Sequence, residues 1–204
     1  MNWSNIIILY KTMSKKILSV CGSPRKGNSE SILLKMKKLL EKEGADNEII
    51  LLRQKNIMPC QGCVEYCNHK LKCHLKDDMP QIMKKMEGAD GLIFISPNYF
   101  KMPTGLLKNF IDRCSIFYTA GKEKLFKKKK AVVIAVGTDV IKGIDVCAKN
   151  ISENFCKTLG LNVVAVKSFQ SHSELKGNFN DIFESGINPG MERNLKKLVD
   201  LLVI

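Results

Sequence analysis

The 204-residue chain has 45% hydrophobic and 26% charged residues, a composition typical of a soluble globular protein and not of a disordered or fibrous one. Its length predicts one α/β domain with a substantial core. The formal net charge of +13 raises nucleic-acid binding as an alternative, but the lysines fall on the expected outer faces of helices and no basic stripe interleaved with aromatic residues accompanies them. We therefore interpret the charge as a lysine-rich surface and expect no nucleic-acid partner.

The N-terminal segment is apolar only over Ile6-Ile7-Ile8-Leu9-Tyr10, which is too short for a membrane helix or a signal-peptide core. We expect residues 1–14 to be an extension, with Met13 as an alternative natural start, and residues 15–204 to form a single domain. No other segment approaches membrane-spanning length, so we expect a cytoplasmic protein without a membrane partner. Its eight cysteines are then reduced thiols or metal ligands.

A strand, a polar turn and a helix follow one another at the start of this domain. Lys16–Cys21 is apolar and β-prone, and the pattern becomes helical from Ser29, which is the expected N-cap. A strand-to-helix turn presents backbone N–H groups and the positive end of the helix dipole to an anion. The spacing fits neither the dinucleotide loop nor the nucleoside-triphosphate loop, and we predict a monoester phosphate such as that of FMN; an ordinary polar loop is the alternative. The predicted phosphate-binding residues are Ser23, Arg25, Lys26, Gly27, Asn28 and Ser29.

A second strand, Glu48–Leu52, is expected to be buried on both faces and precedes a cysteine-rich segment, residues 55–78. This segment is long for a connection in a compact domain, which usually indicates function. Thiolates spaced C-x2-C-x3-C-x5-C can close on one soft metal centre, with Cys60, Cys63, Cys67 and Cys73 as ligands. The residues leave open a [4Fe–4S] cluster, a zinc ion with His69 or His74 as substitute ligands, a redox-active thiol pair, and free thiols.

A third buried strand, Asp90–Ile95, follows a short helix, Met79–Met86, for which Asp78 is the expected cap. The turn after this strand, Ser96 to Pro103, carries two prolines and two aromatic residues at the carboxyl end of a central strand, where open α/β sheets bind ligands. We predict that it lines a flat ring; the alternative is a hydrophobic turn that packs the next helix. The predicted ring-binding residues are Pro97, Asn98, Tyr99 and Phe100, together with Gly137 and Thr138 after the fourth strand.

The rest of the chain continues the alternation of helix and strand. The expected elements are helix Thr104–Phe117, strand Ala131–Val136, helix Gly143–Leu159, strand Leu161–Val166 and helix Met191–Leu202, with the polar stretch Ser168–Asn188 unassigned. Five such repeats predict a three-layer α/β sandwich, in which a five-stranded parallel sheet of order 2-1-3-4-5 has helices on both faces.

Several of these segments resemble the flavodoxin-like NAD(P)H-dependent FMN reductases and the related iron–sulfur flavoproteins. The segments are Gly22-Ser23-Pro24-Arg25 with Gly27-Asn28-Ser29, Pro59-Cys60-Gln61-Gly62-Cys63, Asp77-Asp78-Met79, Ser96-Pro97-Asn98-Tyr99-Phe100 and Gly105–Arg113. The resemblance implies that the first turn holds the FMN phosphate and that the Ser-Pro-x-Tyr-Phe turn lines the isoalloxazine. Iron–sulfur members carry a compact four-cysteine run at this place, typically with two residues in the second gap, whereas Val64-Glu65-Tyr66 makes three here.

We therefore interpret the chain as an FMN-dependent oxidoreductase that moves electrons from NAD(P)H to a small acceptor. The flavin supplies the chemistry, and we predict no essential catalytic side chain. The alternative is an electron carrier with FMN and a [4Fe–4S] cluster that serves a ferredoxin-like partner. A zinc-stabilised nucleic-acid-binding module is a remote alternative. The resemblance also implies a homodimer or a dimer of dimers.

Overall fold

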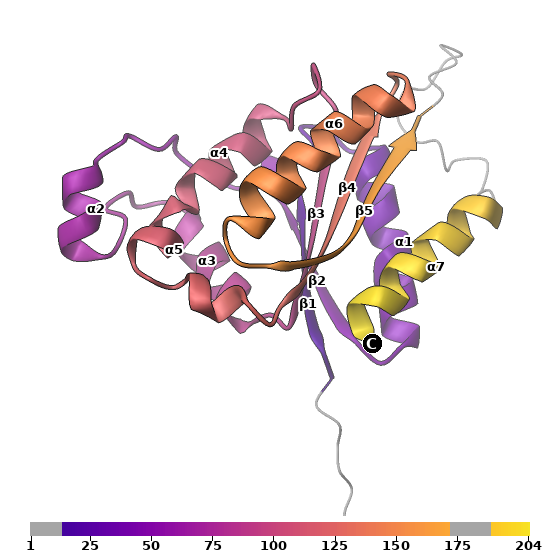
Figure 1. The fold of residues 1–204 in the computed structure, drawn as a ribbon, viewed down its shortest axis with the longest axis horizontal. Coiled ribbons are helices and arrows are strands. Elements are labelled where there is room, and N and C mark those ends of the chain that lie inside the picture. The colour runs from indigo at the N-terminus through magenta and orange to yellow at the C-terminus, as the bar shows by residue number, and fades with distance from the viewer. Residues whose placement is uncertain (1–13, 172–188) are drawn as a thin grey trace, which may run out of the picture.

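Five parallel strands form one sheet in the order β2-β1-β3-β4-β5, as predicted (Figure 1). In chain order the strands are β1 (Lys16–Cys21), β2 (Asp46–Leu51), β3 (Gly91–Pro97), β4 (Lys130–Gly137) and β5 (Asn162–Gln170). This computed structural model describes residues 14–171 and 189–204, so the expected N-terminal extension, apart from Ser14, lies outside the described residues. All four neighbouring strand pairs are parallel. The alternation of strand and helix therefore predicted the topology correctly.

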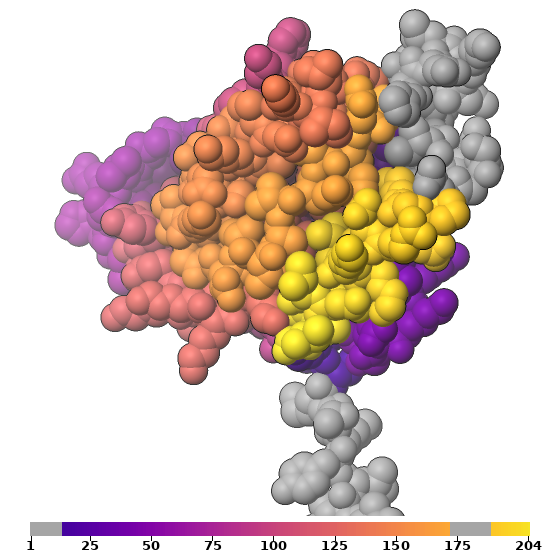
Figure 2. Space-filling model, turned by 45° about the vertical axis from the view of Figure 1, so that its right-hand side comes forward, coloured from indigo at the N-terminus to yellow at the C-terminus, as the bar shows by residue number. Residues whose placement is uncertain are grey.

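Helices cover both faces of the sheet and complete a three-layer sandwich. The α-helices are α1 (Asn28–Lys42), α2 (Val64–Lys70), α3 (Met79–Gly88), α4 (Gly105–Arg113), α5 (Ser115–Thr119), α6 (Ile141–Ile151) and α7 (Pro189–Val203). Short turns η2 (Leu52–Gln54) and η3 (Glu123–Phe126) and a π-helix, η4 (Ser152–Lys157), complete the described elements. Helices α1 and α7 pack together on one face, as Figure 2 shows from the side of α7, and α3, α4 and α6 cover the other.

Alternate residues of the central strands supply the two hydrophobic cores. On β3, Leu92 and Phe94 join the core under α3, α4 and α6, and Ile93 and Ile95 join the core under α1 and α7. All four side chains are fully buried. Since side chains alternate between the faces of a strand, a continuous apolar run is what a parallel sheet covered on both sides requires.

The edge strand β2 corrects one expectation. It begins two residues earlier than expected, at Asp46, and only Asn47 and Ile50 are buried, whereas the other residues are exposed or partly exposed. A polar side chain, Asn47, is buried in it and donates a hydrogen bond to the Ser19 hydroxyl at 2.8 Å. An edge strand has a neighbour on only one side, which leaves part of its surface in solvent.

Two long predicted helices are each divided in the structure. The helix expected over Thr104–Phe117 breaks at Cys114 into α4 and α5, and the one expected over Gly143–Leu159 starts at Ile141 and ends in the π-helix η4. Apolar periodicity located both segments, but it does not report such local changes of helical winding.

The start of α4 is bonded to the ends of two strands. Thr104 caps the helix by accepting a hydrogen bond from Leu107 N, and its hydroxyl donates to the carbonyl of Gly22 just after β1. The Thr104 amide donates to the hydroxyl of Ser96 on β3 at 3.1 Å. A β-carbon on Gly22 would lie only 2.6 Å from Leu107 Cβ. The turn after β1 therefore depends on a glycine that lets α4 approach.

None of the helices within residues 14–171 and 189–204 combines the length and the apolar character needed to cross a bilayer.

We predict that Gly22→Ala destabilises the protein by about 1–3 kcal/mol, because the added methyl group overpacks the contact with Leu107. The free energy of unfolding in urea measures this. Gly105→Ala is the matched control, since a β-carbon there meets nothing within 4 Å, and it should leave stability unchanged or slightly higher. Equal effects of the two substitutions would contradict the prediction.

Candidate functional site

The turn between β1 and α1 is shaped by its own serine. Ser23 is buried, and its hydroxyl donates to the Arg25 carbonyl at 2.7 Å and accepts from the Arg25 amide at 3.4 Å. The side chains of Arg25 and Lys26 are exposed beside it. The expected cap is wrong: α1 begins at Asn28 with Gly27 as N-cap, and Ser29 lies buried inside the first turn. The turn thus combines a helix N-terminus with two unburied cations, which suits an anion.

The turn after β3 leaves one buried acceptor without a partner. The Asn98 amide donates to the Val136 carbonyl at 2.7 Å, which joins this turn to β4. A β-carbon on Gly137 would lie 2.9 Å from Asn98 Cβ, so the glycine makes room for Asn98. Asn98 Oδ1 is buried and has no hydrogen-bond partner among the described residues. A buried acceptor of this kind is suited to a donor on a bound group.

A tight turn displays the aromatic residues next to Asn98. Tyr99 and Met102 exchange backbone hydrogen bonds of 3.0 and 2.9 Å, and Phe100 and Lys101 between them adopt left-handed φ values of 52° and 64°. Phe100 is fully exposed and Tyr99 is 48% exposed. Two successive non-glycine residues with positive φ are uncommon and cost conformational energy, which is typical of functional turns.

These turns lie at one edge of the sheet because β1, β3 and β4 are neighbouring parallel strands. The predicted residues of the first turn and those after β3 and β4 therefore lie at the carboxyl edge of the sheet, the edge at which open α/β sheets bind ligands. A cationic turn for a phosphate and a buried unpaired acceptor for a ring N–H both fit FMN. The roles of the individual predicted residues stay predictions.

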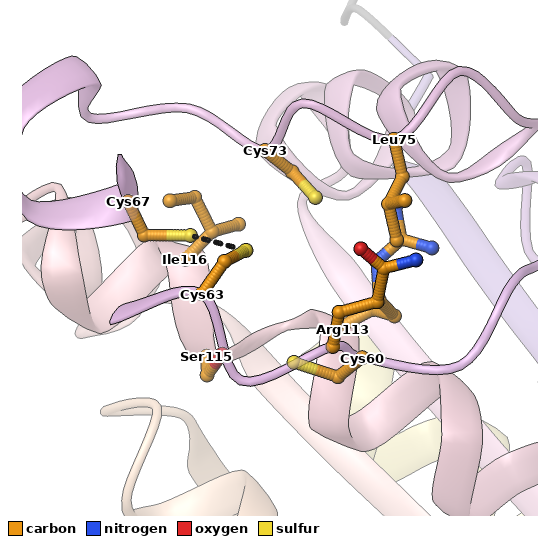
Figure 3. Close-up of a pocket in the computed structure, with 9 residues that line it drawn as sticks. Cys60, Cys63, Cys67, Cys73, Leu75, Arg113, Ser115 and Ile116 are labelled. Atoms are coloured by element: carbon orange, nitrogen blue, oxygen red, sulfur yellow. Dashed lines mark hydrogen bonds between the residues drawn. The ribbon is translucent and has the colours of Figure 1, made fainter. Parts of the chain in front are cut away.

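The cysteine-rich segment forms a second candidate site, on the side of the molecule where α2 and α5 lie (Figure 1). All four predicted ligands, Cys60, Cys63, Cys67 and Cys73, line one pocket that is partly open to solvent (Figure 3). The walls are completed by Gln61, Leu75, Arg113, Ser115 and Ile116. The structure therefore places all four cysteines in the wall of one pocket, and their role as metal ligands stays a prediction.

The thiols are close enough to influence one another. Cys63 Sγ and Cys67 Sγ are 3.9 Å apart, and burial, the hydrogen bond with Cys63 and the charges of the other three thiols raise the pKa of Cys67. Among the described residues, no three His, Cys, Asp or Glu side chains are grouped so as to hold a metal ion. Thiolates are the usual ligands of iron–sulfur clusters and are also common zinc ligands, so the four thiols by themselves leave both metals open.

The histidines that could replace a cysteine do not line this pocket. His74 Nδ1 lies 3.4 Å from Cys63 Sγ, and its Nε2 lies 3.2 Å from Gln61 Oε1. The candidate metal ligands in the pocket wall are therefore cysteine sulfurs and not imidazole nitrogens.

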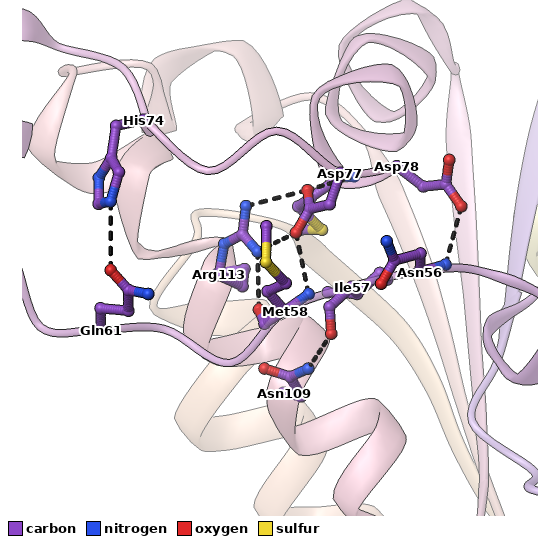
Figure 4. A network of polar contacts seen from close by, with 10 residues as sticks. Asn56, Ile57, Met58, Gln61, His74, Asp77, Asp78, Asn109 and Arg113 are labelled. Carbon is purple, nitrogen blue, oxygen red and sulfur yellow. Dashed lines mark hydrogen bonds and ion pairs between the residues drawn. The ribbon is translucent and has the colours of Figure 1, made fainter.

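A buried ion pair lies where the two ends of the cysteine-rich segment, residues 55–78, come together (Figure 4). Arg113, at the end of α4, forms two hydrogen bonds to Asp77, and its Nη1 also donates to the Met58 carbonyl at 2.7 Å. Asp77 in turn accepts from the amides of Met58 and Met79 at 2.9 and 3.0 Å. The side chains of Arg113 and Asp77 are 1% and 0% exposed. One guanidinium thus connects both ends of the segment to α4.

Sequence reasoning did not identify this ion pair. Asp78 is the N-cap residue of α3, as expected, but its side chain accepts from the Asn56 amide, and the Met79 amide donates to Asp77. Arg113 and Asp77 are 36 positions apart in the sequence. The Asp-Asp-Met and Asp-Arg dipeptide patterns were visible, but neither indicates which residue pairs with which.

Comparison with known proteins gives three kinds of finding. The chain matches the family described as NADPH-dependent FMN reductase over residues 15–173. It is 33% identical over 135 residues to a protein of Archaeoglobus fulgidus named iron-sulfur flavoprotein, covering 66% of this chain and 68% of that protein. It is 38% identical over 99 residues to the iron-sulfur flavoprotein MJ1083 of Methanocaldococcus jannaschii, covering 48% of this chain and 51% of that protein. The chain thus spans about half to two thirds of these curated relatives.

Solved structures share the fold. The flavoenzyme NAD(P)H:(acceptor) oxidoreductase FerB of Paracoccus denitrificans aligns with a TM-score of 0.64 at 19% identity, over 93% of this chain and 95% of that one. The apo form of an NADH:FMN oxidoreductase, EMOB, aligns with a TM-score of 0.63 at 17% identity, over 92% and 87% of the two chains. At this identity the likeness concerns the fold.

We predict that Asp77→Asn lowers the free energy of unfolding by about 3 kcal/mol at pH 7, because it leaves a buried guanidinium without its counter-charge. Burial alone would raise the pKa of Asp77, but the bonds from Arg113, Met58 and Met79 hold it below its usual range. A carboxylate with a depressed pKa stabilises the folded state above its unfolded pKa of about 3.9 and loses that contribution as pH falls through the folded pKa.

Urea unfolding from pH 3 to pH 8 tests this expectation. The difference between wild type and Asp77→Asn should be constant between about pH 5 and 8 and shrink below about pH 4. Asp112→Asn is the control, because Asp112 forms an exposed ion pair with Lys108 on the same helix and should contribute less than about 1 kcal/mol. A pH-independent difference for Asp77→Asn would contradict the assigned role.

Proposed function

This chain belongs to the NADPH-dependent FMN reductase family, and from that premise we propose that it is an FMN-dependent oxidoreductase that passes electrons from NAD(P)H to a small acceptor. The observation that carries the proposal is the meeting of three turns at the carboxyl edge of the sheet, one cationic and one with a buried unpaired acceptor. FMN, when bound, accepts a hydride and releases electrons singly or in pairs. The side chains of this chain bind and orient it.

We assign each turn a separate role in FMN binding. Arg25 and Lys26 attract and hold the phosphate, while Ser23 keeps the turn in shape. Asn98 accepts a hydrogen bond from the ring through its unpaired Oδ1. Tyr99 and Phe100 contribute aromatic surface next to it. No side chain is required as a nucleophile in this scheme.

We further propose that the four-cysteine pocket holds a [4Fe–4S] cluster, with Cys60, Cys63, Cys67 and Cys73 as its ligands. The convergence of four thiols on one pocket supports this, as do the names of the curated relatives. Thiolates are the usual ligands of such clusters. The second candidate function follows from the same observation: a protein with FMN and a cluster can act as an electron carrier for a ferredoxin-like partner.

We also propose a cytoplasmic homodimer or dimer of dimers. All eight cysteines are unpaired, which suits a reducing compartment. Tyr99, Phe100 and Met102 leave exposed apolar surface around the flavin turn, which a second copy of the chain would cover.

For the phosphate turn, we predict that Arg25→Ala weakens FMN binding about tenfold or more, because it removes a charge-assisted contact to the phosphate. Fluorescence quenching on titration of FMN into apoprotein measures the dissociation constant. Lys42→Ala, at the opposite end of α1, is the control and should not change it. If Arg25→Ala and wild type bind FMN with equal affinity, Arg25 does not bind the phosphate.

For the cysteine pocket, we predict that Cys63→Ser and Cys73→Ser each lose iron but retain FMN, since the two cofactor sites use different residues. Protein purified without oxygen should show flavin bands near roughly 370 and 450 nm and a broad brown shoulder, with about four irons per chain. Cys147→Ala is the control, because this thiol lies in the core on α6. Flavin bands without iron in wild type would leave a reductase without a cluster, and a colourless protein that takes up no FMN would overturn the proposed function.

A further inference from the structure

The wall of the cysteine pocket carries one buried positive charge. Among the described residues that line the pocket, Arg113 is the single permanently charged side chain. It comes from the end of α4 and is 1% exposed, so water does not screen its charge. In Figure 3 it lies on the side of the pocket near Cys73 and Leu75.

The side-chain hydrogen bonds of Arg113 to Met58 and Asp77 come from its two terminal nitrogens. Nη1 donates to the Met58 carbonyl and to Asp77, and Nη2 donates to Asp77 at 3.2 Å. Nε is buried and has no partner among the described residues. Leaving a buried N–H unpaired destabilises the folded state, and a charged donor does so more than a neutral one. A donor kept at this cost beside a pocket of thiols is suited to an acceptor bound in the pocket.

The positive charge of Arg113 is complementary to the negative charge that a bound cluster and its thiolates would carry. Four thiolates and an iron–sulfur core carry net negative charge, and each added electron increases it. Nearby positive charge and hydrogen bonds to the sulfurs are among the factors that set the potential of such clusters.

We propose that Arg113 is the positioning residue of the four-cysteine pocket, held by Asp77 and Met58 so that its guanidinium donates through Nε to a sulfur of the cluster and raises the cluster's reduction potential. This inference rests on the proposed cluster and deepens it. Asp77 fixes the guanidinium and at the same time partly offsets its charge. The ion pair thus sets the reduction potential of the cluster and also holds the two ends of the cysteine-rich segment together.

A purely structural role and an electrostatic role predict different signs. If the ion pair only held the two ends of the cysteine-rich segment together, removing either partner would loosen the same loop. Both substitutions would then shift the reduction potential of the cluster in the same direction. In the electrostatic role, loss of the Arg113 charge disfavours the reduced cluster, whereas loss of the Asp77 charge favours it. The sign of the two shifts therefore separates the roles.

The experiment is a redox titration of reconstituted holoprotein, followed by electron paramagnetic resonance and by iron content, in wild type, Arg113→Gln, Arg113→Lys and Asp77→Asn. Lys108→Gln and Asp112→Asn are the matched controls, because they remove the same charges from the exposed ion pair of α4. We expect Arg113→Gln to change the oxidised-to-reduced ratio at fixed potential at least tenfold toward oxidised, a shift of about 59 mV for one electron.

Asp77→Asn should shift the ratio toward reduced, Arg113→Lys should shift it less than Arg113→Gln, and the controls should stay within about threefold of wild type. Shifts of the same sign for Arg113→Gln and Asp77→Asn, or unmoved potentials, would overturn the inference. If Arg113→Gln does not retain iron, the sign of Asp77→Asn against Asp112→Asn decides. A wild type that takes up no iron overturns the cluster assignment and this inference together, whereas iron-loaded wild type with unmoved variants overturns this inference alone.

Discussion

Burial of the central strand β3 on both faces is the constraint on which the rest of the structure depends. Its residues from Gly91 to Ser96 are buried, with β1 and β4 as parallel neighbours. A strand of this kind requires apolar cover on both sides, which α1 and α7 supply on one face and α3, α4 and α6 on the other. Because the strands are parallel, their carboxyl ends coincide, and the polar turns that leave them meet at one edge.

Helix α4 connects this edge with the cysteine pocket. At its first turn Thr104 bonds the carbonyl of Gly22 next to the phosphate turn, and at its last residue Arg113 lines the pocket. Nine helical residues rise about 13 Å. The same helix therefore contacts the turn after β1 at one end and the cysteine pocket at the other.

The eight cysteines fall into two chemical classes. Cys21, Cys114, Cys147 and Cys156 are buried in the cores, and burial raises the pKa of Cys21 to about 11 and that of Cys147 to about 12. Such thiols stay protonated and unreactive. The four cysteines of the pocket are exposed or half-buried and face one another. Accessibility and mutual proximity, not cysteine content, distinguish the residues available for chemistry.

The strands, their order and the two candidate sites could be predicted from the amino-acid sequence. Unbroken apolar runs such as residues 91–95 identify buried strands, and the spacing of the cysteines and the Ser-Pro-Asn-Tyr-Phe turn are local features of the chain. Other features depend on contacts between distant segments and could be found only in the folded structure. Ser29 lies within α1 because the helix begins at Asn28, one residue before the expected cap. Strand β2 is partly exposed because it lies at the edge of the sheet. Arg113 meets Asp77 only after α4 packs against the cysteine segment, and a pairing created by packing leaves no period in the chain.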